Sequence, residues 1–75
     1  METLLSSVNY DYPITPREKE ILQMIVDGYS NKEIGDQLSI SVRTVEAHRQ
    51  NLFRKFDVDN IVKLVRLALD KQLVS

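Results

Sequence analysis

From residue 15 onward, the hydrophobic positions repeat at the spacing of an α-helix. In four segments they recur three and four residues apart, with polar residues on the opposite side of each segment. No stretch alternates hydrophobic and polar residues in the way that a half-buried strand does. The pattern therefore predicts an all-α fold, a bundle of four helices joined by short connections.

Two capping boxes mark the starts of the first two helices. Thr15-Pro16-Arg17-Glu18 and Ser30-Asn31-Lys32-Glu33 each place a hydroxyl residue three positions before a glutamate, so that each can bond the other's backbone N–H. Gly28 predicts the end of the first helix. The residues expected to face the core are Ile21, Leu22, Ile25, Val26, Ile34 and Leu38.

The second and third segments together predict a helix-turn-helix. A short helix is followed by a three-residue turn and by a longer helix, which Ser41 caps and which runs to about Phe56. Asn60, or else Asp59, is the predicted cap of a last helix that runs to about Lys71. The residues that the third helix is expected to turn toward the core are Val42, Val45, Leu52 and Phe56.

Length and composition limit the possible functions. The chain has 75 residues, enough for one small domain, expected over residues 14–75 after an arm or linker over residues 1–13. It has no cysteine, no metal-ligand spacing and no glycine-rich phosphate loop, so we expect no cofactor and no enzymatic activity. No apolar run approaches the ~18 residues that cross a membrane, and we expect a cytoplasmic protein without a membrane partner.

Charge is distributed unevenly along the chain. The net charge is −1, yet the segment from Val42 to Phe56 carries +3. An exposed helix face is normally polar simply because water covers it, but this face lacks the Glu/Lys pairs that usually occur on such a surface. Alanine allows a helix to approach base edges, glutamine can pair with adenine, and arginine holds phosphates. The exposed residues are Arg43, Glu46, Ala47, Gln50 and Arg54, and they favour binding of double-stranded DNA.

Three motifs resemble the LuxR-type DNA-binding domain of the NarL/FixJ response regulators. They are Thr15-Pro16-Arg17-Glu18, Tyr29-Ser30-Asn31-Lys32-Glu33-Ile34 and Arg43-Thr44-Val45-Glu46-Ala47-His48-Arg49. They occur in order at the expected spacing and are followed by a fourth helix, so the resemblance covers about residues 14–74. It implies a bacterial transcription regulator of a two-component system. Its third helix would enter the major groove, and its fourth would support a homodimer on two half-sites.

The resemblance also implies roles for individual residues. Glu46, Ala47 and Gln50 match positions that face base edges. Many members have lysine at the Glu46 position, and an acid there predicts a different preferred sequence. Gly35 departs from the alanine that is usual in the family. The residues expected to contact phosphates are Asn31, Lys32, Thr44, His48 and Lys55, to which the charge pattern adds Arg43 and Arg54.

Two further expectations concern contacts. Arg49 lies near the edge of the predicted core face and is expected to pair with Glu18 or Glu20. The last helix is apolar around ~240°, more than one buried face needs, so either loops or a second chain must cover the rest, and the small size of the domain favours a second chain. The predicted dimer residues are Val62, Arg66, Leu69 and Leu73.

Two alternative functions remain open at this point. Region 4 of a sigma factor shares the Pro-Arg-Glu opening and the helix-turn-helix. A helical protein-interaction adaptor without DNA binding would suit the pI of about 5.7. RNA polymerase is a further candidate partner of a regulator. The length favours a domain cut from a larger regulator over a stand-alone one.

Overall fold

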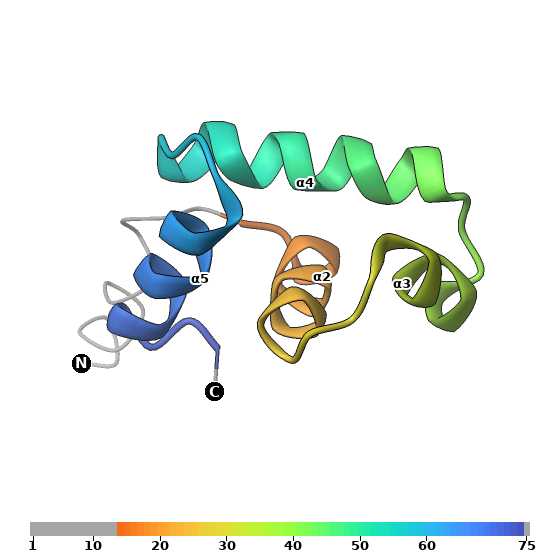
Figure 1. The fold of residues 1–75 in the computed structure, drawn as a ribbon, viewed down its shortest axis with the longest axis horizontal. Helices are drawn as coiled ribbons and strands as arrows, with labels where there is room; N and C mark the ends of the chain where they lie inside the picture. Colours follow the sequence, from red (N-terminus) through yellow and green to blue (C-terminus); the bar gives the residue numbers. More distant parts are fainter. Residues whose placement is uncertain (1–13, 75) are drawn as a thin grey trace, which may run out of the picture.

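Four helices account for most of the described chain. The computed structural model describes residues 14–74, and within them there is no strand. The helices, labelled as in Figure 1, are α2 (Pro16–Val26), α3 (Asn31–Leu38), α4 (Val42–Phe56) and α5 (Ile61–Asp70). The all-α, four-helix fold expected from the periodicity is confirmed, while the arm predicted over residues 1–13 lies outside the described residues.

The first two helices begin with the predicted capping boxes. Thr15 Oγ1 accepts from the backbone N–H of Glu18 at 3.1 Å, and Glu18 Oε1 accepts from the backbone N–H of Thr15 at 2.9 Å. Ser30 and Glu33 repeat the arrangement, with distances of 3.1 and 2.7 Å. Each box satisfies two backbone donors that have no partner within their helix.

The last two helices also begin at the predicted residues. Ser41 Oγ accepts from the backbone N–H of Thr44 at 3.0 Å, and Asn60 Oδ1 accepts from that of Lys63 at 2.9 Å. Both caps fix where the chain turns into a helix.

All four helices end in the same way. Each is followed by a residue with a positive φ, and the next backbone N–H then donates to a carbonyl five residues earlier, which is a Schellman motif. The residues with positive φ are Gly28, Ser39, Asp57 and Gln72. The residues that donate the closing bond are Tyr29, Ile40, Val58 and Leu73, of which the last three pack against the core.

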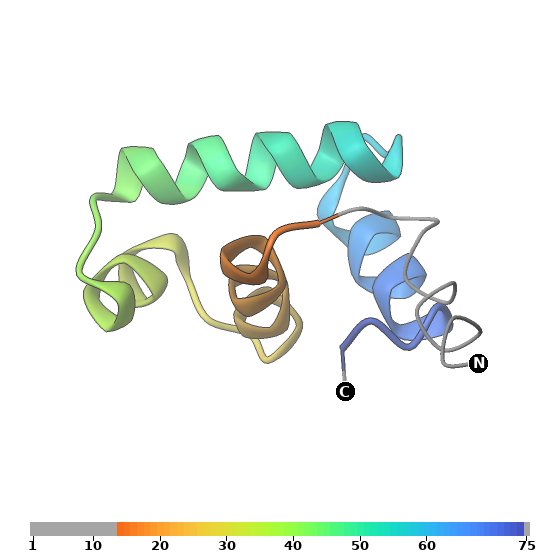
Figure 2. The same ribbon diagram turned by 180° about the vertical axis from the view of Figure 1, so that it is seen from behind.

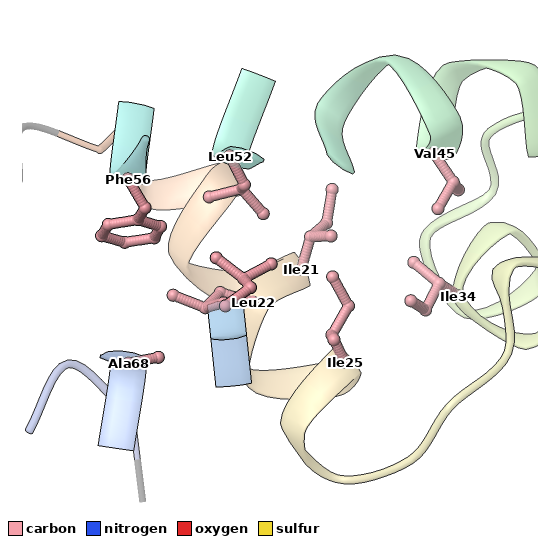
Figure 3. Packing of buried hydrophobic residues seen from close by; sticks show 9 residues of the cluster. Ile21, Leu22, Ile25, Ile34, Val45, Leu52, Phe56 and Ala68 are labelled. Atoms are coloured by element: carbon pink, nitrogen blue, oxygen red, sulfur yellow. The ribbon is translucent and has the colours of Figure 1, made fainter. Parts of the chain in front are cut away.

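The core is a single cluster between α4 and the other helices. The long helix α4 packs against α2, α3 and α5, and α2 also contacts α5. In Figures 1 and 2, α4 runs along one side of the molecule and α5, α2 and α3 lie along the other. Figure 3 places Ile34 and Val45 together at one end of the cluster, with Leu52 and Phe56 at the other. The cluster holds α4 along most of its length.

One predicted core residue is wrong. Val42 was expected to face the core, but its side chain is 41% exposed, whereas Val45, three residues later, is buried. Val42 is the first residue of α4, directly after the turn from α3, and the rest of the described chain covers it much less than it covers Val45. Helical periodicity gives the direction of a side chain but not whether a neighbouring element extends far enough to cover it.

The turn of the helix-turn-helix depends on Gly35. This residue is buried in α3, and its carbonyl accepts from the backbone N–H of Ile40 at 2.9 Å. A Cβ at position 35 would lie 2.7 Å from the backbone oxygen of Ile40. The absence of a side chain at Gly35 therefore lets the turn close tightly against α3 before α4 begins.

Candidate nucleic-acid interface

One side of α4 is polar and uncovered. Most of the α4 side chains predicted to contact DNA are exposed, His48 being half-buried, while Val45, Leu52 and Phe56 on the opposite side are buried. The exposed set is Arg43, Thr44, Glu46, Ala47, Gln50 and Arg54. The packing of α4 on three other helices thus presents this face outward as one rigid surface.

An open groove lies between the start of α3 and the exposed side of α4. Its volume is about 530 Å³, and Asn31, the first residue of α3, forms one wall. The rest of the lining comes from α4: Arg43, Glu46, Ala47, Arg49, Gln50 and Phe53. The groove therefore brings the three predicted base-contacting residues together with cationic and amide side chains.

A second groove of about 660 Å³ follows α4 toward its C-terminal end. Gln50 and Phe53 line both grooves, so the two depressions meet at the middle of α4. Phe53 was not among the predicted site residues. It is half-buried between the core and exposed sides of the helix, where an apolar residue gives no sequence signal that separates packing from binding.

The N-terminal turn of α3 faces the same region. Its free backbone N–H groups and the positive end of the helix dipole favour an anion. Lys32 pairs with Asp36 at 3.3 Å, but both side chains are largely exposed, so the pair contributes little and leaves the ammonium able to contact a phosphate. Asn31 Oδ1 is buried without a hydrogen-bond partner among the described residues.

Lys55 does not lie free at the DNA-facing surface. Its Nζ donates to Glu18 Oε1 at 2.8 Å, and Glu18 is the buried glutamate of the first capping box, with a side chain only 7% exposed. In the DNA-free domain this ammonium is therefore already paired, and the phosphate contact by Lys55 stays a prediction. The contact joins the start of α2 to the last turn of α4.

Several groups act on the Glu18 carboxyl. Burial raises its pKa, but the hydrogen bonds from Lys55 and the Thr15 backbone, with the charge of Lys55, outweigh burial and hold the pKa below its ordinary value. The carboxylate is therefore ionised at neutral pH and fixes the position of Lys55.

The expected partner of Arg49 is corrected. Glu18 pairs with Lys55, and Glu20 pairs with Arg17 at 3.4 Å. Arg49 is half-buried and lines the groove between α3 and α4, where it forms no ion pair with the described residues. Arg49 thus joins the cationic residues of the candidate interface.

The remaining predicted contacts lie around this face. Arg54 donates to Asn51 Oδ1 at 2.8 Å, which holds its guanidinium along the helix. The Thr44 hydroxyl lies 2.9 Å from that of Ser41, so it belongs to the cap of α4 while staying exposed. His48 is half-buried on α4.

The surface predicted for the dimer is smaller than expected. Val62 and Leu69 are 62% and 45% exposed, and with Arg66 they line a mostly apolar groove of about 420 Å³ on α5. Leu73 does not continue this row, because α5 ends at Asp70 and the chain reverses at Gln72. Leu73 is half-buried against the core instead, so it does not line this groove, and its part in a dimer stays a prediction.

The described part of the chain holds neither a metal-binding cluster nor a membrane-spanning helix. Within residues 14–74, no three His, Asp or Glu side chains lie close enough together to hold a metal ion. None of the helices there is long and apolar enough to cross a membrane.

Curated proteins similar to this chain are regulators. The chain is 49% identical over 63 residues to the transcriptional regulatory protein MctR of Rhizobium johnstonii, and it is 46% identical over 68 residues to the response regulatory protein YgeK of Escherichia coli. These alignments cover 84% and 91% of this chain but 29% and 46% of the two relatives. The chain thus spans less than half the length of either relative.

A solved structure has the same fold. The crystal structure of Vibrio cholera VqmA in a complex with a ligand and DNA matches with a TM-score of 0.78 and 33% identity. The match covers 81% of this chain and 27% of VqmA. The four helices described here are therefore arranged as in part of a protein solved together with DNA.

The family itself follows from a match over most of the sequence. The profile described as "Bacterial regulatory proteins, luxR family" matches residues 12–68, which include α2, α3 and α4. This match decides against the sigma-factor alternative and confirms that the domain is not an enzyme. The chain belongs to the luxR family of bacterial regulatory proteins and is the helix-turn-helix DNA-binding domain of a transcription regulator.

Proposed function

We propose that α4 enters the major groove of double-stranded DNA and reads its sequence with Glu46, Ala47 and Gln50. The exposed face of α4 carries the proposal, because its small and amide side chains line one open groove bordered by arginines. Recognition helices of helix-turn-helix proteins contact base edges with residues of their N-terminal half, where Glu46 and Ala47 lie.

Residues on both sides of this face supply the phosphate contacts. The exposed arginines flank the base-contacting residues along α4, and the start of α3 adds backbone N–H groups. Arg49 enters this set because it lines the groove, and Lys55 would join it only by leaving Glu18, which holds its ammonium. The proposed residues are Asn31, Lys32, Arg43, Thr44, His48, Arg49 and Arg54.

The proposed assembly is a homodimer formed on paired half-sites. Val62, Arg66 and Leu69 provide an exposed, mostly apolar surface on α5. That surface is small beside the ~800 Å² per partner of a typical stable interface, so the free domain is expected to be monomeric at micromolar concentration. DNA would bring two copies together.

The domain is proposed to act within a longer response regulator. Its relatives extend well beyond the aligned part, and one of them is named a response regulatory protein. Such a regulator would act in the cytoplasm, where bacterial DNA lies. RNA polymerase stays a predicted partner, and no described surface is assigned to it.

Titration of a mixed-sequence duplex tests the proposed function. We expect fluorescence anisotropy to show binding to the duplex. The logarithm of the binding constant should fall linearly with the logarithm of the salt concentration between about 50 and 200 mM, because binding releases counterions from the DNA. Selection from a random duplex library should then yield two related half-sites. A folded domain that binds no duplex at the lower salt concentration would instead favour the protein-interaction adaptor.

A further inference from the structure

Glu46 is an unusual residue for a surface that meets DNA. It is the only acidic residue of α4, and its side chain is exposed in the groove beside α3. Arg43 and Arg49 lie three residues before and after it, yet neither forms an ion pair with Glu46 among the described contacts. The Glu46 carboxylate is therefore not neutralised within α4.

DNA binding would remove water from this carboxylate. An ionised carboxylate only accepts hydrogen bonds, so phosphate oxygens cannot replace the lost water. In the major groove, guanine presents two acceptors, and thymine presents an acceptor and a methyl group. Only cytosine N4 and adenine N6 offer a donor there. Without such a donor, Glu46 would be a buried charge with no partner, which weakens binding.

The two bases with donors differ at the neighbouring atom. Adenine N7, beside the N6 amino group, is an acceptor and repels a carboxylate, whereas an amide can use N6 and N7 together. Cytosine carries no acceptor of its own beside its N4 amino group in the major groove, where only O6 of the paired guanine adjoins it, whereas adenine N6 lies between its own N7 and thymine O4. The carboxylate therefore fits cytosine, while the amide of Gln50, one helical turn later on the same face, fits adenine.

From this we infer that Glu46 determines specificity by accepting a hydrogen bond from the N4 amino group of one cytosine in each half-site. The inference rests on the proposed binding of α4 in the major groove. Ala47 has no side chain long enough to obstruct Glu46, and the nearby arginines can neutralise the adjacent phosphates. Glu46 thus lowers the affinity for DNA in general and selects one base.

Parallel selections from a random duplex library test the inference. The proteins are the wild-type chain, Glu46→Ala, and Glu20→Ala, a control that removes one exposed acid from α2 instead of α4. We expect a cytosine at one position of each half-site for the wild type and the control. Glu46→Ala should lose only that preference, and because alanine favours helix at an exposed position, it should stay folded.

Binding to defined duplexes gives the magnitude. Replacing the selected C·G pair by T·A should weaken wild-type binding about 10- to 100-fold, corresponding to the 1–3 kcal/mol of a good base contact. The same replacement should change Glu46→Ala binding less than about threefold. Replacing the paired guanine by 7-deazaguanine, which lacks N7, should leave wild-type binding unchanged, because the contact is to cytosine.

Four results would overturn the inference. Glu46→Ala could select the same sequence as the wild type and bind all duplexes more tightly, which would show that the acid acts only through its charge. A preference for adenine at the Glu46-dependent position would contradict the argument from N7. Weakening by 7-deazaguanine would assign the contact to an arginine on guanine. If the wild type selects no sequence, the proposed function itself fails.

Discussion

Glu18 combines three roles in one side chain. It completes the capping box of α2, it is buried against the core, and it holds Lys55 of α4 at 2.8 Å. The motif that marks the start of the first helix thus also positions the end of the proposed recognition helix. The sequence predicted the cap, because Thr15 and Glu18 are three residues apart, but not the pairing across 37 positions.

Glu18→Gln should lower stability in a pH-dependent way. The pKa of Glu18 lies below its ordinary value of 4.5, so its ionised form stabilises the fold fully above that pH. We expect the free energy of unfolding of the variant to be about 1–2 kcal/mol lower near neutral pH. This loss is smaller than for a fully buried charged hydrogen bond, because the Lys55 side chain is 34% exposed. The gap in the free energy of unfolding between the variant and the wild type should shrink as the pH falls below 4.5 and through the pKa of Glu18 in the folded state.

Urea unfolding of both proteins across this pH range measures the gap. Glu20→Gln is the control, since it breaks only the exposed pair with Arg17 and should change stability by less than about 0.5 kcal/mol. A gap that is independent of pH would mean that Glu18 contributes through packing and capping alone.

Arg43 and Lys55 should differ in their effects on DNA binding. Arg43→Ala should weaken binding to all duplexes and reduce the slope of log affinity against log salt by about one, because one phosphate contact is lost. Lys55→Ala should lower the melting temperature, since it leaves buried Glu18 without its partner, while its salt slope stays near that of the wild type.

Anisotropy titrations at several salt concentrations, below the melting temperature of each variant, provide both slopes. If Lys55→Ala reduces the slope as much as Arg43→Ala does, Lys55 leaves Glu18 when DNA binds and contacts a phosphate after all.

At the scale of helices, starts were more predictable than ends. Each start depends on a capping side chain within three residues of the backbone group that it bonds, so sequence spacing alone identifies it. Three of the four ends use serine, aspartate or glutamine in the left-handed conformation, where glycine is the usual signal. The reversal after α5 was therefore not predicted, and Leu73 does not continue the helical row of Val62 and Leu69.

The candidate interface was predictable to a similar extent. The exposed row of α4 followed from helical periodicity, because residues three and four apart share a face. The pairing of Lys55 with Glu18, and the lack of an ion pair between Arg49 and either glutamate of α2, did not follow, since both depend on how α2 and α4 cross. Val42 was misplaced because helical periodicity does not show how much of a side chain the neighbouring elements cover.

Gly35→Val should destabilise the helix-turn-helix. Even a Cβ at this position would lie 2.7 Å from the Ile40 backbone oxygen, and valine adds two methyl groups to it. We expect a loss of about 2–3 kcal/mol from overpacking, despite the gain in helix propensity over glycine. Gln37→Val, on the exposed side of α3, tests the cost of a β-branched residue alone.

Thermal unfolding followed by circular dichroism compares the two variants. Gln37→Val should lie within about 0.5 kcal/mol of the wild type. Equal losses in both variants would mean that the turn yields easily and that the close approach at Gly35 costs nothing.

For the whole molecule, half of the apolar surplus predicted for the last helix is used internally. Of the residues beyond one buried stripe, Leu67 and Leu73 pack against the core, while Val62 and Leu69 stay exposed. Residues 14–74 therefore present two separate exposed surfaces, the polar face of α4 and a small apolar patch on α5. Substitutions on one surface can be tested without disturbing the other.

Leu69→Glu should separate dimerisation from DNA contact. Because Leu69 is 45% exposed, the variant should keep its helical signal and bind a single half-site as the wild type does. A carboxylate in the apolar groove of α5 would face the same charge across a two-fold axis, so cooperative binding to a two-half-site duplex should be lost. Tyr29→Glu adds the same charge at an exposed loop position and should keep the cooperativity.

Titrating duplexes with one and with two half-sites gives the affinity for a single half-site and the cooperativity. If Leu69→Glu unfolds the domain, the residue belongs to the core. If the folded variant still binds cooperatively, the two copies meet through a surface other than α5.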